Sequence, residues 1–148
     1  MTERPYFPKT TPEIYEAIRG LAALVERGGL EKSLIELVKT RASQINGCAF
    51  CLDMHSKEAR KHGETEQRLY LLNAWRETPL FSARERAALA WTECLTRVAI
   101  DGAPDAAYRE LADAFSPVEI ATLTALIGVI NTWNRIAVGL NWPLPRAA

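Results

Sequence analysis

Residues 48–55 read Cys48-Ala49-Phe50-Cys51-Leu52-Asp53-Met54-His55, directly after an Asn46-Gly47 pair that is typical of a break between two helices. Residues three and four positions apart lie on the same face of a helix, so Cys48, Cys51 and His55 would line up along one side. Two thiols with a base beside them are typical of a redox centre or a metal site. This segment therefore predicts a helix boundary and, directly after it, a redox centre or metal site.

Helix signals continue on both sides of this segment, and strand signals are nearly absent. Proline favours the first helical position at Pro12 and Pro117, and Ser82-x-x-Glu85 and Ser116-x-x-Glu119 favour capping boxes. The helices predicted from these signals span about 12–27, 31–45, 48–62, 64–73, 82–100, 104–115 and 117–140. The sequence therefore predicts an all-α fold, with residues 1–148 forming a single domain that bundles about six to eight helices.

Composition limits the function classes. The 148 residues carry eighteen basic and eighteen acidic side chains, a balance that favours neither a nucleic-acid surface nor a membrane surface. The N-terminus has no apolar core of the kind that a signal peptide needs, and the apolar stretch around 120–130 is too short and too polar to cross a bilayer. We expect a cytoplasmic protein, a setting in which structural disulfides are rare.

The surroundings of the two thiols favour thiolate chemistry. A free cysteine has a pKa of about 8.5, so reactivity at neutral pH needs activation. Cys48 is expected in the first turn of its helix, where the helix dipole favours a thiolate, and His55 lies four residues after Cys51, within reach of its proton. A second thiol can trap an oxidised sulfur as a disulfide. Together these features predict a peroxidatic or disulfide-exchange centre.

Other uses of the pair fit less well. A c-type haem site needs histidine directly after the second cysteine, where Leu52 stands. An iron–sulfur cluster takes four thiolates, and the chain has three cysteines. A zinc site or an inert pair remains as an alternative, but we expect neither a metal nor a cofactor. We interpret Cys94 as a small buried hydrophobe and His62, beside Gly63, as a helix-terminus residue.

Glu36 has two interpretations. Ser33-x-x-Glu36 fits a capping box, in which the carboxylate only accepts a backbone N–H. Alternatively, Glu36 lies on the polar side of its helix, on a stripe that leads through Thr40 towards Gly47 and the start of the cysteine helix. On the residues alone, both interpretations stay open.

Residues 34–73 resemble the alkylhydroperoxidase D-like family of the carboxymuconolactone decarboxylase superfamily. The family signature Glu-x11-Cys-x2-Cys-x3-His is met by Glu36, Cys48, Cys51 and His55. The segment Asn131-Thr-Trp-Asn-Arg-Ile-Ala also resembles the last helix of the family. The resemblance implies an all-helical fold and the reduction of hydroperoxides by a thiol pair.

The same resemblance implies a role for each residue. Cys51 would be oxidised by the peroxide, Cys48 would resolve it, and His55 and Glu36 would form a proton relay. The helix dipole points instead to Cys48 as the more acidic thiol. The regenerating partner would be another dithiol, such as a lipoylated or thioredoxin-like protein, and the substrate a small hydroperoxide. Neither nucleic acid nor membrane is expected as a partner.

One departure from the family pattern motivates alternatives. Some members carry a histidine directly before the second cysteine, where this chain has Phe50, which transfers no proton. A disulfide reductase or redox-responsive module without peroxidase activity is therefore a second hypothesis. A lyase acting on a lactone acid, with His55 as base, is a third, although it has no use for a dithiol.

Large aromatic side chains and apolar helices predict an assembly. We expect Trp91 in the core and Trp142, near the C-terminus, as an interface candidate. The residues 120–138 are apolar on more than one side, which favours a helix in the core or at a subunit interface. The family resemblance implies a homo-oligomer, a trimer or a hexamer.

Overall fold

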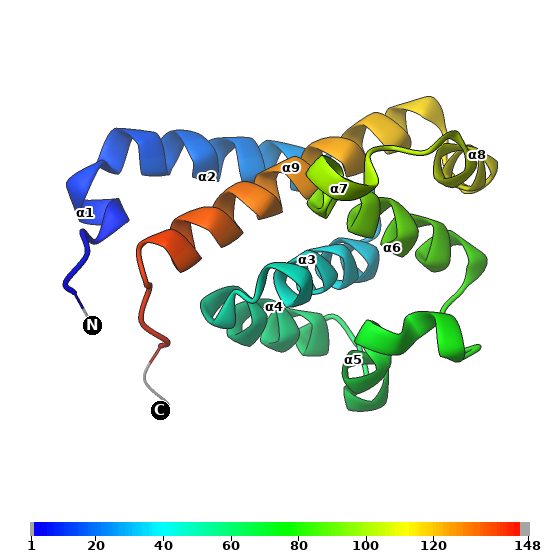
Figure 1. Ribbon diagram of the computed structural model, residues 1–148, viewed down its shortest axis with the longest axis horizontal. Helices are drawn as coiled ribbons and strands as arrows, with labels where there is room; N and C mark the ends of the chain where they lie inside the picture. Colours follow the sequence, from blue (N-terminus) through cyan, green and yellow to red (C-terminus); the bar gives the residue numbers. More distant parts are fainter. Residues whose placement is uncertain (1, 146–148) are drawn as a thin grey trace.

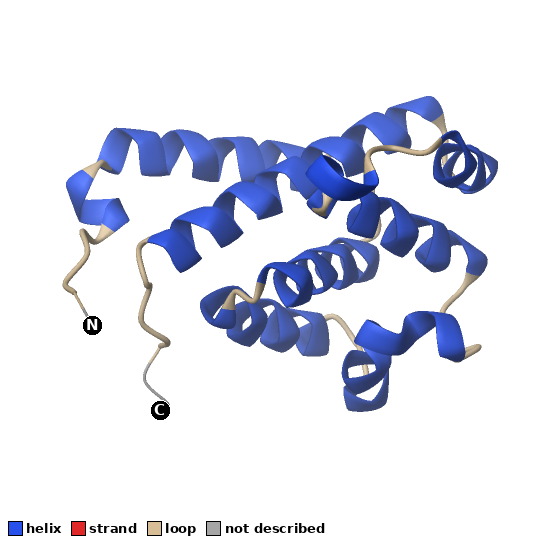
Figure 2. Ribbon diagram, in the orientation of Figure 1, coloured by secondary structure: helices blue, strands red, loops and turns tan. Residues whose placement is uncertain are grey.

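The computed structural model describes residues 2–145, and they are helical with no strand among them (Figures 1 and 2). The elements are α1 (Phe7–Thr10), α2 (Pro12–Glu26), α3 (Lys32–Asn46), α4 (Ala49–Lys61), α5 (Glu66–Leu71), a 3-10 helix η1 (Leu72–Glu77), α6 (Ala83–Thr96), α7 (Val98–Asp101), α8 (Asp105–Ala114) and α9 (Pro117–Gly139). The all-α prediction is confirmed. The elements exceed the predicted six to eight because α1 and α7 are single turns of four residues each, too short to leave a periodic pattern.

Helix α3 lies at the centre of the molecule, packed against α4, α6 and α9 (Figure 1). Its apolar side is buried at Leu34, Leu37, Val38 and Ala42, while Ile45 is only half-buried. Its polar side is buried as well, because α4 packs there, so every residue from 34 to 43 is buried. The polar side chains of α3 therefore need partners inside the protein.

Local signals set the ends of most helices. The capping boxes at Ser82 and Ser116 both form, and each serine accepts a backbone N–H while the glutamate side chain returns a bond to the cap. Gly47 ends α3 in the left-handed conformation (φ 64°), which glycine adopts without steric cost. The capping box at Ser33 does not form, since α3 begins at Lys32 with no side-chain cap.

Two predicted helices end earlier than expected. The segment 64–73 divides into α5 and η1, with Ala74 outside helical values (φ −115°, ψ 29°), and this kink turns Trp75 into the core. The long helix predicted to residue 100 ends at Thr96, because the chain bends at Arg97 before α7. No glycine or proline marks either break in the sequence, so neither could be predicted from it.

Helix α9 runs the length of the molecule beside α2, and the two chain ends lie on the same side (Figure 1). The Arg4 Nη1 donates to the Gly139 carbonyl at 2.7 Å, and the rings of Tyr6 and Trp142 have centroids 6.3 Å apart. The segment after α9 thereby folds back over the start of α4. Among residues 2–145, no helix has the length and apolar character that a bilayer crossing needs.

Candidate redox site

Cys48 and Cys51 form a disulfide at the start of α4, with Cα atoms 5.3 Å apart. Cys48 was expected in the first helical turn; it is instead the N-cap residue, with extended backbone (φ −86°, ψ 97°), because Gly47 ends α3 only one residue earlier. Its Sγ accepts the Cys51 backbone N–H at 3.3 Å. Both residues are buried, at 1% and 2% exposure, so reagents reach the sulfurs only through cavities.

His55 and Glu36 meet across two helices. The His55 Nδ1 lies 3.0 Å from the Glu36 Oε2, and both residues are buried. Burial alone would raise the pKa of Glu36, but the hydrogen bond from His55 and the nearby charge of Lys39 outweigh it, so this pKa lies below its ordinary value. An ionised carboxylate only accepts, so the Nδ1 carries the hydrogen and the Nε2 is left as the basic nitrogen.

This contact decides between the two interpretations of Glu36. Its carboxylate does not cap α3; it bonds a titratable side chain of α4. The sequence could not make this choice, since both interpretations use the same residue at the same spacing.

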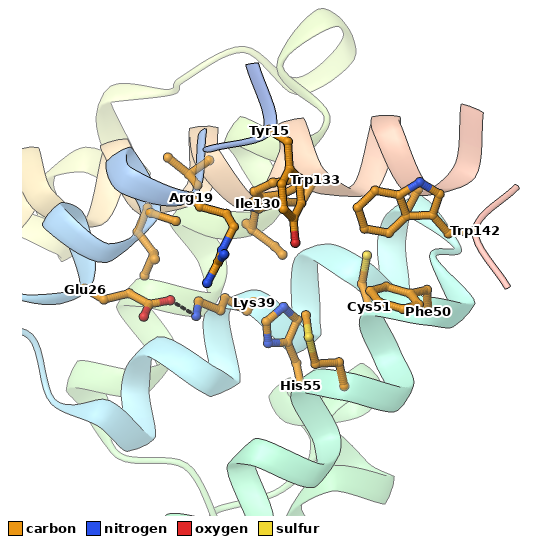
Figure 3. A pocket seen from close by; sticks show the side chains of 15 residues that line it. Tyr15, Arg19, Glu26, Lys39, Phe50, Cys51, His55, Ile130, Trp133 and Trp142 are labelled. Atoms are coloured by element: carbon orange, nitrogen blue, oxygen red, sulfur yellow. Dashed lines mark hydrogen bonds and ion pairs between the residues drawn. The ribbon is translucent and has the colours of Figure 1, made fainter. Parts of the chain in front are cut away.

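Lys39 was missed by the sequence interpretation. Its Nζ lies 3.4 Å from the Glu36 Oε1 and is also ion-paired with Glu26 of α2 (Figure 3). Lys39 is three residues after Glu36 and thus on the same side of α3. That spacing was a usable signal, whereas the pairing with Glu26 depends on how α2 packs.

A cavity of about 230 Å³ opens in front of Cys51 and His55 (Figure 3). Helix α4 forms one wall, and α2, α9, the C-terminal segment and Lys39 of α3 form the others. The lining is mostly apolar and aromatic: Tyr15, Arg19, Ala22, Glu26, Lys39, Phe50, Cys51, Met54, His55, Leu126, Val129, Ile130, Trp133, Ala137 and Trp142. The cavity is larger than the cavity of about 150 Å³ that holds benzene in an engineered apolar core.

Cys51 and Cys48 line different cavities. Cys48 lines a second one of about 160 Å³, together with Gly47, Ala49, Val138 and Asn141. Phe50 and Trp142 line both cavities, and their rings meet edge to face with centroids 5.1 Å apart. This aromatic pair forms part of the wall between the approaches to Cys51 and to Cys48. Trp142 is thus at least partly covered within its own chain.

Buried amides join the end of α3 to α9. The Asn134 Nδ2 donates to the Ser43 Oγ at 3.0 Å, and the Asn46 Nδ2 donates to the Oδ1 atoms of Asn134 and Asn131 at 2.9 Å and 3.0 Å. Both α9 asparagines belong to the segment 131–137 that resembled the family's last helix. These bonds fix the position of Gly47 and therefore the start of the cysteine helix.

Two further residues from the sequence interpretation lie outside this arrangement. Cys94 was expected to be buried, but it is half-buried on α6, and burial raises the pKa of its thiol. His62 is the C-cap of α4, as expected, and it is exposed. Neither residue lines the cavity of Cys51 or that of Cys48.

Comparison with known proteins gives consistent results. Residues 12–94, more than half of the chain, match the carboxymuconolactone decarboxylase family model. The uncharacterized protein YdfG of Bacillus subtilis (strain 168) is 36% identical over 140 residues, covering 95% of each chain. A stretch of 41 residues is 49% identical to an alkyl hydroperoxide reductase AhpD of Hyphomonas neptunium (strain ATCC 15444), covering 28% of this chain and 23% of that one.

One solved structure is similar over its whole length. The ATU0492 protein of Agrobacterium tumefaciens has unknown function, and an AhpD role in antioxidant defence has been suggested for it. It superposes with a TM-score of 0.95 at 46% identity, covering 99% of this chain and 100% of that chain. The chain therefore belongs to the carboxymuconolactone decarboxylase family, and within it to the alkylhydroperoxidase D-like proteins.

Proposed function

We propose that this protein is a thiol-dependent peroxidase that reduces small hydroperoxides through the Cys48–Cys51 pair. The observation that carries the proposal is that Cys51 and His55 line one cavity while His55 is bonded to an ionised Glu36. A thiol, a base and a group that orients the base are the parts that an activated nucleophile needs.

The first step oxidises Cys51. His55 accepts the thiol proton at its Nε2, because its Nδ1 donates to Glu36. The Cys51 thiolate attacks one oxygen of the hydroperoxide, the O–O bond breaks, and the leaving oxygen takes the proton from His55. The products are an alcohol and a sulfenic acid on Cys51. Glu36 stabilises the imidazolium that exists between the two proton transfers.

The second step forms the disulfide. The Cys48 thiol attacks the Cys51 sulfur, an S–S bond forms and water leaves, which returns the pair to the state in this structure. A dithiol reductant, such as a lipoylated or thioredoxin-like protein, then exchanges with the disulfide and carries away two electrons. The cytoplasm, where thiols are kept reduced, is the setting that suits this cycle.

Geometry and dipole favour different thiols as the attacking one, and the cavities reconcile them. Cys51 shares its cavity with the base, so it meets the peroxide. Cys48 lines its own cavity, so the reductant attacks the Cys48 sulfur and Cys51 leaves as the thiolate. The second thiol of the reductant then breaks the mixed disulfide, and Cys48 leaves as a thiolate that the Cys51 backbone N–H stabilises at the start of α4.

Two measurements test the proposal in a Cys94→Ser background, which leaves only the pair of thiols. One equivalent of hydroperoxide should remove both thiols and lower the intact mass by two hydrogens. Cys51→Ser should abolish hydroperoxide consumption, whereas Cys48→Ser should accumulate a sulfenic acid that dimedone traps. Full consumption by Cys51→Ser would contradict the proposal.

A second candidate is a disulfide reductase or redox-responsive module. Phe50 favours it, because this side chain stands where a proton-transferring histidine occurs in some family members and supplies only an apolar wall. Peroxide consumption no faster than by a free thiol, together with rapid reduction of a disulfide substrate, would support this candidate. Lactone decarboxylation that survives in the Cys48→Ser, Cys51→Ser double variant would support a lyase instead.

We also propose a homo-oligomer, a trimer or a hexamer. Ile14, Leu21 and Leu24 on α2 are each at least half exposed, which suits a helix that another subunit covers. A monomer mass by light scattering at micromolar concentration would contradict this assembly.

A further inference from the structure

A chain of charged side chains extends from His55 to the protein surface. The His55 Nδ1 bonds one oxygen of Glu36, the Lys39 Nζ lies 3.4 Å from the other oxygen, and the same Nζ pairs with Glu26. The Lys39 and Glu36 side chains are each 10% exposed, but that of Glu26 is 40% exposed. This series of charged side chains therefore begins at the buried His55 and ends at the solvent-exposed Glu26.

These residues also separate two cavities. A third cavity, of about 510 Å³ and more polar, also borders His55, and Glu36, Glu58 and His62 are in its lining. Glu26, Lys39, Met54 and His55 line both cavities, whereas Cys51 lines only the apolar one. The charged side chains thus stand between Cys51 and a polar opening on the other face.

The charges balance when His55 is protonated. Buried ions are costly unless they are paired. Glu26 and Lys39 cancel one another, which leaves the Glu36 carboxylate to cancel an imidazolium on His55. The arrangement is therefore suited to hold the protonated base that exists while Cys51 is a thiolate.

We infer that Lys39 is a positioning residue that sets the acidity of the Cys51 thiol through Glu36 and His55, and that Glu26 holds Lys39 in place. The Lys39 cation favours the ionised form of Glu36, and an ionised Glu36 favours the imidazolium that accompanies the Cys51 thiolate. The Glu26 carboxylate offsets part of the Lys39 charge and so has the opposite effect. The inference rests on the proposed thiol chemistry at Cys51, but thiol acidity can be measured without turnover.

Other charged groups face the same cavities and stay unchanged in the test. Helix α2 contributes Tyr15 and Arg19 to the apolar cavity, and the lining residues of α9 are uncharged. The polar cavity adds Arg27, Lys32, Glu58 and His62. Because these groups are the same in every protein tested, their effect on the Cys51 pKa cancels when variants of Lys39 and Glu26 are compared with the parent protein.

The experiment measures how fast iodoacetamide alkylates Cys51 in the reduced protein across a pH series. The parent is Cys94→Ser, and fragment-ion mass spectrometry assigns the modified cysteine. Lys39→Met should raise the pKa of Cys51 and slow its alkylation at neutral pH by about three- to tenfold. Glu26→Gln should shift the pKa the other way and speed alkylation, and Lys39→Arg, which keeps the charge, should restore the parent profile.

Opposite shifts of the Cys51 pKa in Lys39→Met and Glu26→Gln would support the inference. If the ion pair only stabilised the fold, breaking it from either side would have the same effect. Unchanged profiles, or shifts in the same direction in Lys39→Met and Glu26→Gln, would overturn it. If Lys39→Met does not fold by circular dichroism, the sign of the shift in Glu26→Gln decides, since that side chain is partly exposed. Absence of peroxide turnover together with opposite shifts would refute the peroxidase and leave this inference standing.

Discussion

Two buried carboxylates interact with α3, and their surroundings differ. Glu93 of α6 accepts from the Arg41 Nε and the Trp75 Nε1, both at 2.9 Å, and from the Arg76 Nη1 at 2.5 Å. Glu36 has one titratable partner in His55 and one cation in Lys39. Both carboxylates are buried, yet only Glu36 borders a cavity that also contains a base.

The difference supports the proposal that Glu36 serves the thiol chemistry while Glu93 holds helices together. Burial alone would raise the pKa of Glu93, but three donors that stay protonated outweigh it and hold this pKa below its ordinary value. The donors of Glu93 therefore keep it ionised and immobile. The partner of Glu36 is an imidazole, whose nitrogens can both accept and donate a proton, whereas the partners of Glu93 only donate. Burial and a lowered pKa are common to both carboxylates, so the proposed role of Glu36 rests on the chemistry of its partner.

Among the carboxylate variants, Glu36→Gln should have the largest effect. The amide removes the carboxylate that orients His55 and stabilises its imidazolium, so kcat/KM for hydroperoxide should fall by about 10²- to 10⁴-fold. Initial rates of peroxide consumption over a substrate series measure the loss. The matched comparison is Glu93→Gln, assayed under conditions in which it remains folded, which should retain most of the activity. Equal losses in the two variants would erase the distinction between the carboxylates.

Glu93→Gln should instead be the less stable variant. It leaves the Arg41 guanidinium, which is 9% exposed, without its ionic partner, and breaking a buried ion pair in this way costs about 3–5 kcal/mol. Urea unfolding followed by circular dichroism gives the free energy of unfolding for both variants. If Glu36→Gln were destabilised by as much, Glu36 would have a structural role too.

The stability difference between the parent and Glu93→Gln should shrink in acid. The pKa of Glu93 is lower in the folded than in the unfolded protein. The stability that follows from this shift is complete above the unfolded pKa and is lost as the pH falls through the folded one. Between pH 7 and pH 3, the free energies of unfolding of the two proteins, measured by urea titration, should therefore converge by up to about 2 kcal/mol, since each pH unit below the unfolded pKa contributes at most about 1.4 kcal/mol. A constant difference would mean that Glu93 has the same pKa in the folded and the unfolded protein, contrary to the lowered pKa.

The smallest effect is expected from a surface carboxylate on the cysteine helix. Asp53 pairs with Lys57 at 2.7 Å, and the lysine side chain is 65% exposed. Asp53→Asn should change the free energy of unfolding by about 0.3–0.5 kcal/mol and leave the peroxide rate unchanged. The same assays as above apply, and a loss of activity here would show that any charge removed from α4 affects the site.

Some features of the site were accessible from the sequence and others were not. The spacing of Cys51 and His55 predicted that both would lie on one side of a helix, and both do line one cavity. Cys94 and the end of α6 were predicted wrongly, because exposure and helix termination there depend on packing. Lys39 escaped notice because a lysine on a polar helix face usually points to solvent.

The sequence by itself determined the helices and the dithiol. Backbone signals such as Gly47 and the capping serines act within a few residues, so they operate wherever the chain lies. Only the tertiary structure decided that Glu36 bonds His55, that Cys51 and Cys48 line different cavities, and that Lys39 pairs with Glu26. Those choices join α2, α3, α4 and α9, and contacts between helices distant in sequence are set by packing of the whole chain.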